Sequence, residues 1–272
     1  MASSDVTVMG AGVFGLSVAF ACARRGARVR VLDRRGVAAG ASGGVVGALA
    51  PHVPENWNAK KAFQLDSLLM AEAFWREVDG LSGRPSGYRR LGRVQPVPVG
   101  GEALARERET GAAKLWQGRA EWRVEPLAQT GRWAPLAESG LVIRDTLSAR
   151  LHPRRACESL ARAVEALGGA VEIGDEASGE RVVWATGYEG LAVLSEALGR
   201  PVGAGVKGQA ALLEFDAGDA PQIYADGLHV IPHDDATVAV GSTSERAFGS
   251  PDRVDARLDG LLARAVAAVP AL

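Results

Sequence analysis

The sequence predicts an α/β fold, α+β overall, in which a parallel-sheet domain is interleaved with a mainly β domain. Three observations predict it: a strand–glycine–helix–strand unit at residues 6–33, a helix followed by two strand-like runs over residues 153–185, and successive strand-like runs from residue 206 onward. Strands that alternate with helices build parallel sheets, whereas strands joined by short turns build antiparallel ones. The expected boundaries give the parallel-sheet domain residues 1–80 and 150–203, and the β domain residues 81–149 and 204–272.

The first unit begins within ten residues of the N-terminus. Val6–Met9 is a short apolar strand, the sequence GAGVFG follows at residues 10–15, and a helical stretch leads into a second strand at residues 28–32. This strand ends on Asp33. A glycine-rich turn alone is weak evidence, but the order strand, glycines, small-faced helix, strand and acid is typical of a dinucleotide-binding unit.

The glycines and the acid of that unit each have a physical task. Gly10 permits the sharp turn out of the strand, Gly12 lets a pyrophosphate approach the backbone, and Gly15 lets the helix pack closely on the sheet. The helix N-terminus supplies unpaired N–H groups and positive potential. Asp33 follows Gly15 by 18 residues, where a carboxylate accepts hydrogen bonds from ribose hydroxyls.

The composition excludes several other classes of protein. The chain has 272 residues, 31 basic and 32 acidic side chains and a net charge of −1, which argues against a dedicated nucleic-acid or membrane-surface binder. No run reaches the roughly 18 apolar residues of a membrane span. Cys22 and Cys157 fall in expected helices without a CxxC or metal-type neighbour, so we expect reduced thiols in a cytoplasmic protein and no metal site.

The remaining elements are predicted from periodicity and from glycine and proline signals. Residues 82–135 carry a poor signal, with one strand-like run at 93–97. Pro153 occupies a helix start, where proline is tolerated. The expected helices are 63–81, 153–167 and 254–268, and the expected later strands are 170–173, 181–185, 206–215, 228–232 and 237–240.

The segment ASGGVVGALAP at residues 41–51 favours FAD over NAD. It begins eight residues after Asp33, where an NAD-binding domain would continue into its next helix. Small residues in this segment allow a second stretch of backbone to approach a pyrophosphate and then to follow a flat ring system.

The chain resembles the amine and amino-acid oxidase family of FAD proteins, that is, the D-amino-acid oxidase superfamily with the glycine oxidases and sarcosine oxidases. The resemblance depends on the order and spacing of segments over nearly the whole chain. They are ASGGVVGALAP at 41–51, the helix around 68–75, LHPR at 151–154, VWATG at 183–187, VKGQ at 206–209, HVIP at 229–232 and VGSTSE at 240–245.

The resemblance implies a Rossmann-like FAD-binding domain and assigns residues to the cofactor by position. The pyrophosphate faces the glycine motif and residues 41–42, Asp33 holds the adenosine ribose with Arg34 beside the adenine edge, and residues 47–49 line the isoalloxazine. An ordinary loop hydroxyl at Ser42 and a simple turn glycine at Gly187 stay open as alternatives. The full assignment is Gly10, Ala11, Gly12, Val13, Phe14, Gly15, Asp33, Arg34, Arg35, Ala41, Ser42, Gly47, Ala48, Leu49 and Gly187.

The resemblance also implies the reaction. The family oxidises the C–N bond of a small amine or amino acid by hydride transfer to flavin N5, after which the imine is hydrolysed and electrons pass to oxygen or another acceptor. The implied partners are this small-molecule substrate and the electron acceptor, with no nucleic acid and no membrane. An oligomer is left open. The β domain is expected to hold the substrate.

His229 and His52 are the candidate catalytic residues. His229 alternates with apolar neighbours on an expected strand, at a position where the glycine-oxidase-like pattern has a tyrosine that faces the site, and Tyr224 lies just upstream. His52 directly follows the segment at 41–51. A solvent-facing strand residue and a surface-loop histidine are the alternative interpretations. For Lys207 a solvated side chain is favoured over a place near the flavin.

Two departures from the family pattern motivate other hypotheses. The link between residues 173 and 181 is short, and the sequence reaches residue 272 without the family's substrate-carboxylate arginine, its next strand and its last helix. A portion of a longer protein is therefore expected, and residues 1–272 alone are expected to bind FAD weakly and to turn over poorly. The alternatives are a flavin-binding protein without turnover and a relative of tRNA-modification oxidases.

Overall fold

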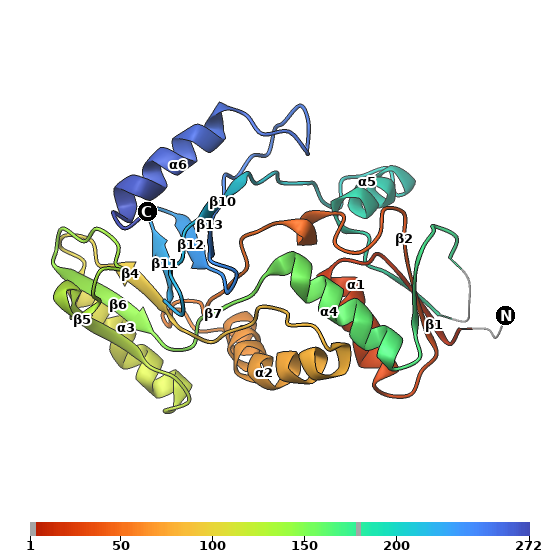
Figure 1. Cartoon of the computed structure of the whole chain (residues 1–272), viewed down its shortest axis with the longest axis horizontal. Coiled ribbons are helices and arrows are strands. Elements are labelled where there is room, and N and C mark those ends of the chain that lie inside the picture. Colours follow the sequence, from red (N-terminus) through yellow and green to blue (C-terminus); the bar gives the residue numbers. More distant parts are fainter. Residues whose placement is uncertain (1–3, 178–180) are drawn as a thin grey trace. The chain divides into compact units, whose positions relative to one another are not determined.

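The computed structural model describes residues 4–177 and 181–272, and its internal contacts divide the chain into two compact units (Figure 1). Unit 1 contains residues 1–44, 75–86 and 152–207, and unit 2 contains residues 45–74, 87–151 and 208–272.

Residues 45–74 differ from the expected division, which placed them with residues 1–80. In the structure they contact unit 2, because β3 (Ala48–Leu49) pairs with β7 (Ala149–Arg150). In addition, Leu65 and Leu68 belong to an apolar cluster of that unit.

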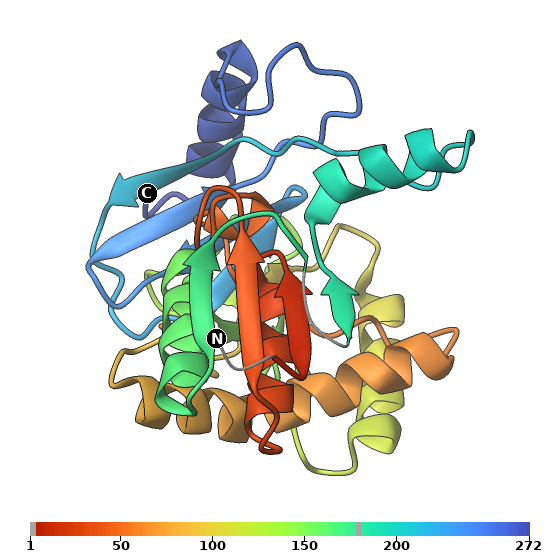
Figure 2. The same ribbon diagram turned by 90° about the vertical axis from the view of Figure 1, so that its right-hand side faces the viewer.

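Unit 1 is built on a parallel sheet, which has four strands within the described residues, in the order β8-β2-β1-β9. The central strands β1 and β2 are mostly buried, whereas the edge strands β8 and β9 are partly exposed. Helices α1 and α4 pack against each other and against strands of this sheet (Figure 2). The bounds are β1 Val6–Met9, β2 Val29–Asp33, β8 Ala170–Ile173, β9 Val182–Trp184, α1 Val13–Ala23 and α4 Pro153–Ala166.

Helix α4 shows how local signals set an element. His152 is its N-cap and accepts a hydrogen bond from the Arg155 N–H, and Pro153 occupies the first turn, where its missing N–H has no partner to lose. The side chains of Ala156, Leu160 and Val164 are completely buried. This helical spacing turns one apolar stripe toward the core.

Helix α5 (Gly187–Ala197) is an element that the periodicity argument missed. It follows β9 directly, and none of its residues is buried. Gly187, which the resemblance assigns to the cofactor with a turn glycine as the alternative, is the first residue of this helix, with φ +62°.

Unit 2 is built on a mixed sheet, whose described strands follow the order β10-β13-β12-β11-β4-β6-β5. The pair β4–β11 is parallel and the other neighbours are antiparallel. The bounds are β4 Arg93–Pro96, β5 Trp122–Pro126, β6 Leu141–Asp145, β10 Ala210–Glu214, β11 Gln222–Ala225, β12 Leu228–Pro232 and β13 Thr237–Gly241.

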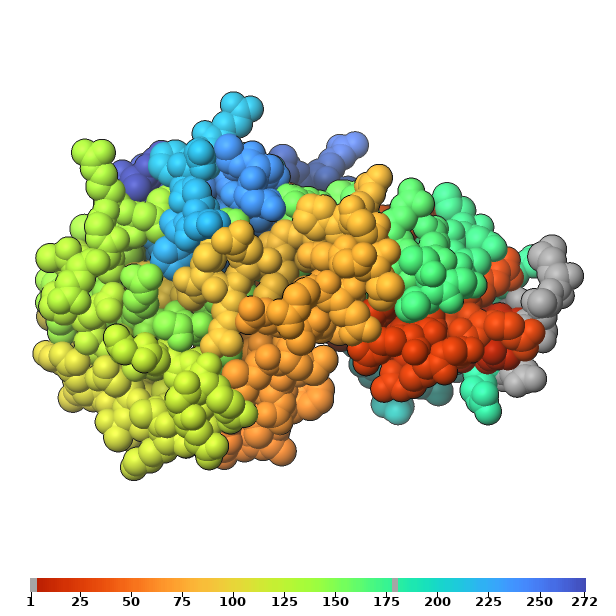
Figure 3. Space-filling model, turned by 60° about the horizontal axis from the view of Figure 1, so that its bottom comes forward, coloured from red at the N-terminus to blue at the C-terminus, as the bar shows by residue number. Residues whose placement is uncertain are grey.

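The two faces of this sheet carry different cores. On one face Val94, Ile223 and Val230 pack in a cluster with α6 (Ala256–Ala268). On the other face Trp122 and Ile143 join a cluster with α3 (Glu102–Trp116) and the first half of α2 (Ala59–Ser82). The exposed outer side of α3 is part of the surface in Figure 3 (yellow-green). Two 3-10 turns complete the elements, η1 Ala41–Gly43 and η2 Leu127–Gln129.

The predicted fold class is confirmed by this architecture. Within the described residues no helix is both long enough and apolar enough to cross a membrane.

Gly80 provides a first testable prediction. It lies exposed in α2, and a Cβ added there would meet no atom within 4 Å. Glycine inside a helix costs about 0.5–1 kcal/mol relative to alanine. We expect Gly80→Ala to raise the free energy of unfolding by that amount in a urea titration. A variant no more stable than the parent would contradict this.

Candidate active site

The turn after β1 is shaped by two glycines. Gly10 has φ +113°, and a Cβ there would overlap the carbonyl oxygen of Ala185, which follows the neighbouring strand β9. A Cβ on Gly15 would overlap the carbonyl oxygen of Gly10 and lie 3.3 Å from the Ala185 Cβ. The start of α1 is therefore pressed against β1 and the end of β9, which only glycine permits.

The N-terminus of α1 is open toward one side. Its N-cap, Gly12, contributes no side-chain hydrogen bond, and the Val13 N–H donates to Ser42 Oγ at 3.0 Å. Ser42 belongs to η1, so this hydrogen bond joins the segment at 41–51 to the glycine motif. Ala41, in the same turn, is exposed, and Phe14 is 82% exposed.

Asp33 joins the loop after β1 to the loop after β2 at the carboxyl edge of the sheet. Its Oδ2 accepts from the Ala11 N–H at 2.9 Å, and its Oδ1 accepts from the N–H groups of Arg35 at 2.9 Å and Gly36 at 3.1 Å. A carboxylate offers about four acceptor positions. The three backbone bonds leave about one for a further donor.

The basic residues after Asp33 form ion pairs at the surface. Arg34 pairs with Asp175 at 3.4 Å, and Arg35 pairs with Glu189 in the first turn of α5 at 2.9 Å. All four side chains are substantially exposed, so each pair contributes little to stability.

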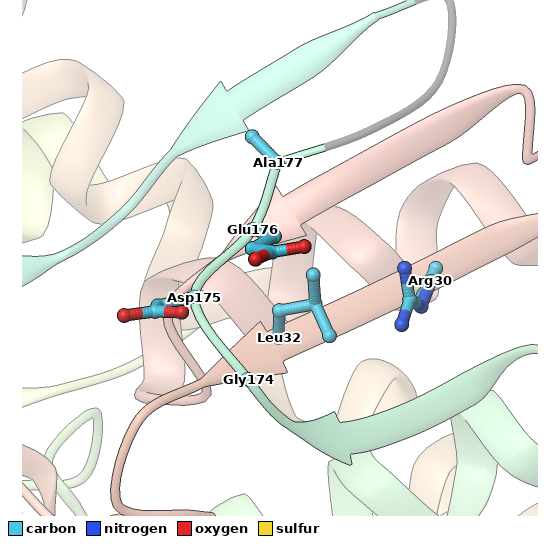
Figure 4. Close-up of a pocket in the computed structure, with 6 residues that line it drawn as sticks. All are labelled: Arg30, Leu32, Gly174, Asp175, Glu176 and Ala177. Carbon is cyan, nitrogen blue, oxygen red and sulfur yellow. The ribbon is translucent and has the colours of Figure 1, made fainter.

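A pocket of about 320 Å³ lies beside the end of β2. Figure 4 shows Arg30 and Leu32 projecting from β2 and Gly174–Ala177 following β8. The Gly174 N–H donates to the backbone carbonyl of Asp33 at 3.1 Å, which joins the segment after β8 to the end of β2. Open α/β sheets bind ligands at this carboxyl edge.

Gly47, Ala48 and Leu49 lie in unit 2, where the backbone of the strip 45–49 is held at several points. The Leu151 N–H donates to the Gly47 carbonyl at 2.9 Å, and His233 Nε2 lies 2.9 Å from the Val45 carbonyl oxygen. Ala48 and Leu49 form β3, which pairs with β7. Burial lowers the pKa of His233, so it is neutral at pH 7.

Gln222 ties this strip to the large sheet of unit 2. Its Nε2 donates to the Leu49 carbonyl at 3.2 Å and to the Ala149 carbonyl at 3.0 Å, one on each strand of the β3–β7 pair. Gln222 is 2% exposed. Since it reaches β3 from β11, the strip lies over the face of the sheet to which Gln222 points.

His229 lies on that same face of the sheet. It stands opposite Tyr224 in register, with the ring centroids 4.8 Å apart, and Tyr224 and Gln222 point to one face because they are two residues apart on a strand. Burial, with a smaller contribution from the charge of Arg93, lowers the pKa of His229 to about 4. An unperturbed value near 6.5 does not apply here. Among the described residues none is a hydrogen-bond partner of His229 Nδ1, which is buried.

The other predicted residues have simpler surroundings. His52 lies on the loop after β3, and its backbone N–H donates to Gln64 Oε1 at 2.8 Å. Cys22 and Cys157 are free thiols, and burial raises the pKa of Cys157 to about 11 against an opposing hydrogen bond with Ser42. No group of three or more His, Cys, Asp or Glu side chains within the described residues is placed to hold a metal ion.

The structure adds Arg93, Gln222 and His233 to the residues around these sites. The only signal for Arg93 and Gln222 in the sequence is a polar side chain alternating with apolar ones in a strand. Such a pattern gives the face of a strand but not its neighbours.

Comparison with protein families identifies one that spans nearly the whole chain: DAO, described as FAD dependent oxidoreductase, matches residues 5–272. The bifunctional protein ThiO/ThiG of Synechocystis sp. is 27% identical over 296 residues, which cover 99% of this chain and 43% of that protein. The tRNA 5-methylaminomethyl-2-thiouridine biosynthesis bifunctional protein MnmC of Albidiferax ferrireducens is 56% identical over 54 residues, 20% of this chain and 9% of that protein. The chain thus spans less than half the length of these relatives.

Solved structures show the same fold. Glycine oxidase from Geobacillus kaustophilus superimposes with a TM-score of 0.79 at 22% identity, over 98% of this chain and 78% of that one. Iminodiacetate oxidase from Chelativorans sp. BNC1 gives a TM-score of 0.75 at 20% identity, over 98% and 79%. With the family match over residues 5–272, the chain belongs to the DAO family of FAD-dependent oxidoreductases.

Proposed function

We propose that this chain oxidises the C–N bond of a small amine or amino acid. Bound FAD supplies the hydride acceptor at flavin N5, and electrons then pass to oxygen or another acceptor. The observation that supports it most is the glycine turn with Asp33 at the carboxyl edge of the unit 1 sheet, because a side chain at Gly10 or Gly15 would not fit. The single free acceptor position of Asp33 suits a ribose hydroxyl.

In the proposed arrangement each part of FAD has its own protein contacts. The pyrophosphate faces Gly12, the Val13 turn and Ser42, where the helix N-terminus favours negative charge. Asp33 holds the adenosine ribose, and the pocket beside the end of β2 takes the adenine. The strip 45–49 lines the isoalloxazine, and its hydrogen bonds to His233, Leu151 and Gln222 keep it rigid.

His229 is proposed to face the amine of the substrate. A pKa of about 4 leaves its imidazole neutral at pH 7, so Nδ1 is available to accept a hydrogen bond from the amine. A protonated amine cannot donate hydride readily from its carbon, so the reacting form is the neutral amine, which His229 would orient through this hydrogen bond.

The reaction is tested with the FAD-loaded protein and a panel of amino acids and amines. We expect formation of the keto acid or aldehyde together with ammonia or a primary amine, and peroxide where oxygen is the acceptor. Full occupancy by FAD without any product from the panel, with oxygen and with an artificial acceptor, would support a flavin protein without turnover. Retention of RNA that weakens as salt rises would support the tRNA-modification alternative.

Replacing His229 by glutamine separates its proposed role from a packing role. We expect kcat/KM to fall about 10- to 100-fold, the range for loss of one hydrogen bond to a charged group, while FAD affinity stays at the parent value. Tyr224→Phe keeps the ring beside His229 and is the control for packing. Equal activity of His229→Gln and the parent would remove His229 from the site.

The lowered pKa of His229 also predicts a pH dependence of stability. The unfolded chain binds a proton near pH 6.5 and the folded one near pH 4, so the free energy of unfolding falls as the pH drops between these values. We expect His229→Gln to lose less stability than the parent over this interval in urea titrations. Parallel pH curves for the two proteins would contradict the assignment.

Gln222→Leu tests the anchoring of the strip. The change removes two hydrogen bonds to the carbonyls of Leu49 and Ala149 and leaves these two carbonyl groups buried without that donor. An unsatisfied buried group costs about 1–3 kcal/mol. We expect a lower midpoint of unfolding and an altered absorbance spectrum of bound flavin. A spectrum identical to that of the parent would show that the strip does not line the flavin.

A further inference from the structure

Arg154 is an exposed arginine in the first turn of α4, and its side chain reaches the turn η1. Its Nη2 donates to the carbonyl of Gly43 at 3.3 Å. A Cβ on Gly43 would lie only 3.0 Å from this nitrogen, so the glycine lets the guanidinium approach the backbone of the turn closely. The thiol of Cys157, one turn further along α4, hydrogen-bonds with Ser42 of η1. The start of α4 therefore flanks the same turn that carries Ser42.

Two helix N-termini meet at η1, and neither is neutralised by an acid. Helices α1 and α4 pack against each other and α4 contacts η1, while Ser42 accepts a hydrogen bond from the Val13 N–H at the start of α1. Neither helix has an acidic residue in its first turn. Each N-terminus carries a partial positive charge, to which Arg154 adds a full one. This part of unit 1 therefore favours an anion.

Arg154 has no counter-charge within the part of the chain that the structure describes. The Gly43 carbonyl accepts one hydrogen bond from it, and no carboxylate forms an ion pair with it. By contrast, Arg35 pairs with Glu189 and Arg162 pairs with Glu165. A cation at a helix N-terminus is electrostatically unfavourable. A bound phosphate would remove this cost, and the planar fork of an arginine suits phosphate oxygens.

We propose that Arg154 donates to the pyrophosphate of FAD and supplies a full positive charge that the glycine turn itself lacks. The turn offers backbone N–H groups and the hydroxyl of Ser42, which are neutral donors, whereas the pyrophosphate is an anion. The inference rests on the proposed place of the pyrophosphate beside Gly12, Val13 and Ser42. It does not depend on whether the chain oxidises an amine.

The first test separates binding of the phosphates from binding of the nucleoside. ADP and adenosine are each titrated against the apoprotein in competition with FAD, whose fluorescence reports its release. We expect the parent to bind ADP more tightly than adenosine. Arg154→Gln should weaken ADP binding about 5- to 30-fold, as for loss of one charged hydrogen bond at the surface, and should leave adenosine binding unchanged.

The other outcomes of this titration contradict different claims. If the parent prefers ADP and Arg154→Gln keeps the full preference, the pyrophosphate site stays and Arg154 is not part of it. An equal fall for ADP and adenosine would show a structural role and also overturn the proposal. If the parent binds ADP and adenosine equally, the pyrophosphate does not lie beside η1, and both the proposed place and the role of Arg154 are refuted.

Matched variants distinguish the charge of Arg154 from its hydrogen bond to Gly43. Glutamine at this position can still donate to the carbonyl but is neutral, whereas Arg154→Lys keeps the charge. We expect the ADP affinity of Arg154→Lys to lie between those of the parent and Arg154→Gln. Equal losses in the two variants would overturn the proposal. Arg155→Gln is the control, because Arg155 lies in the same helical turn but its Nε donates to the Pro85 carbonyl at 3.4 Å. Its ADP affinity should equal that of the parent, and an equal loss there would indicate only a general effect of charge.

Salt dependence and stability provide a second, independent test. Exposed charges are screened as salt rises, so the ratio of the FAD dissociation constants of Arg154→Gln and the parent should shrink from low to high KCl. A ratio that does not change with salt would contradict a charged contact. Without FAD, Arg154→Gln should unfold at the same temperature as the parent or at a higher one, because an uncompensated cation at a helix N-terminus has been removed. A lower unfolding temperature would indicate that Arg154 supports the fold rather than the cofactor.

Discussion

Replacing Gly15 by alanine is expected to weaken FAD binding at least 100-fold. The new Cβ would overlap the backbone carbonyl of Gly10 and crowd the Cβ of Ala185, and neither neighbour can rotate away as a flexible side chain would. Helix α1 must therefore move off the sheet, which displaces its N-terminal N–H groups from the pyrophosphate. Overpacking of this kind costs about 1–3 kcal/mol or more.

The measurement is a fluorescence titration of apoprotein with FAD, together with thermal unfolding of the apoprotein. We expect at least a 100-fold rise in the Kd of FAD for Gly15→Ala. Gly80→Ala makes the same chemical change where nothing lies within 4 Å, and it should bind FAD like the parent. A Gly15→Ala protein that retains the parent's FAD affinity would show that the glycine motif does not hold the cofactor.

Asp33→Ala is expected to weaken FAD binding about 10- to 100-fold. The variant loses a charged hydrogen bond to the ribose, a bond of roughly 1.5–3 kcal/mol. It also loses the three bonds that fasten the N–H groups of Ala11, Arg35 and Gly36. Asp5→Ala is the control. Asp5 also accepts a hydrogen bond from a backbone N–H, that of Arg28, and one from the Arg28 side chain, but it lies at the opposite end of the strands. Its FAD affinity should not change.

A pair of nucleotides separates ribose recognition from loop support. The parent is expected to bind ADP more tightly than its 2′-deoxy analogue, and Asp33→Ala should bind both equally weakly. If the preference for ADP survives in Asp33→Ala, the carboxylate supports the loops but does not contact the ribose.

Elements with strong local signals could be predicted from the sequence. The glycine turn, the buried stripe of α4 and the strands β1 and β2 are determined by residues close together in the chain. Helices α3 and α5 were missed because few of their residues are buried: α3 buries only Ala105, Ala112 and Trp116, and α5 buries none. Without an apolar face, periodicity has little to detect.

The candidate site also contains residues that could be predicted from the sequence and residues that could not. The residues of unit 1 follow one motif, and the structure joins Ala11 to Asp33 and Val13 to Ser42. Arg93 and Gln222 lie far apart in the chain and become neighbours only through the β4–β11 register. The lowered pKa of His229 likewise depends on burial, which a strand pattern does not reveal.

Anaerobic mixing of the FAD-loaded protein with amino acids is the most direct test of C–N oxidation. Bleaching of the visible flavin absorbance, with one equivalent of keto acid and one of ammonia formed per flavin, is the predicted result. A protein that holds FAD yet keeps its full absorbance with every amino acid and amine would contradict the proposed reaction.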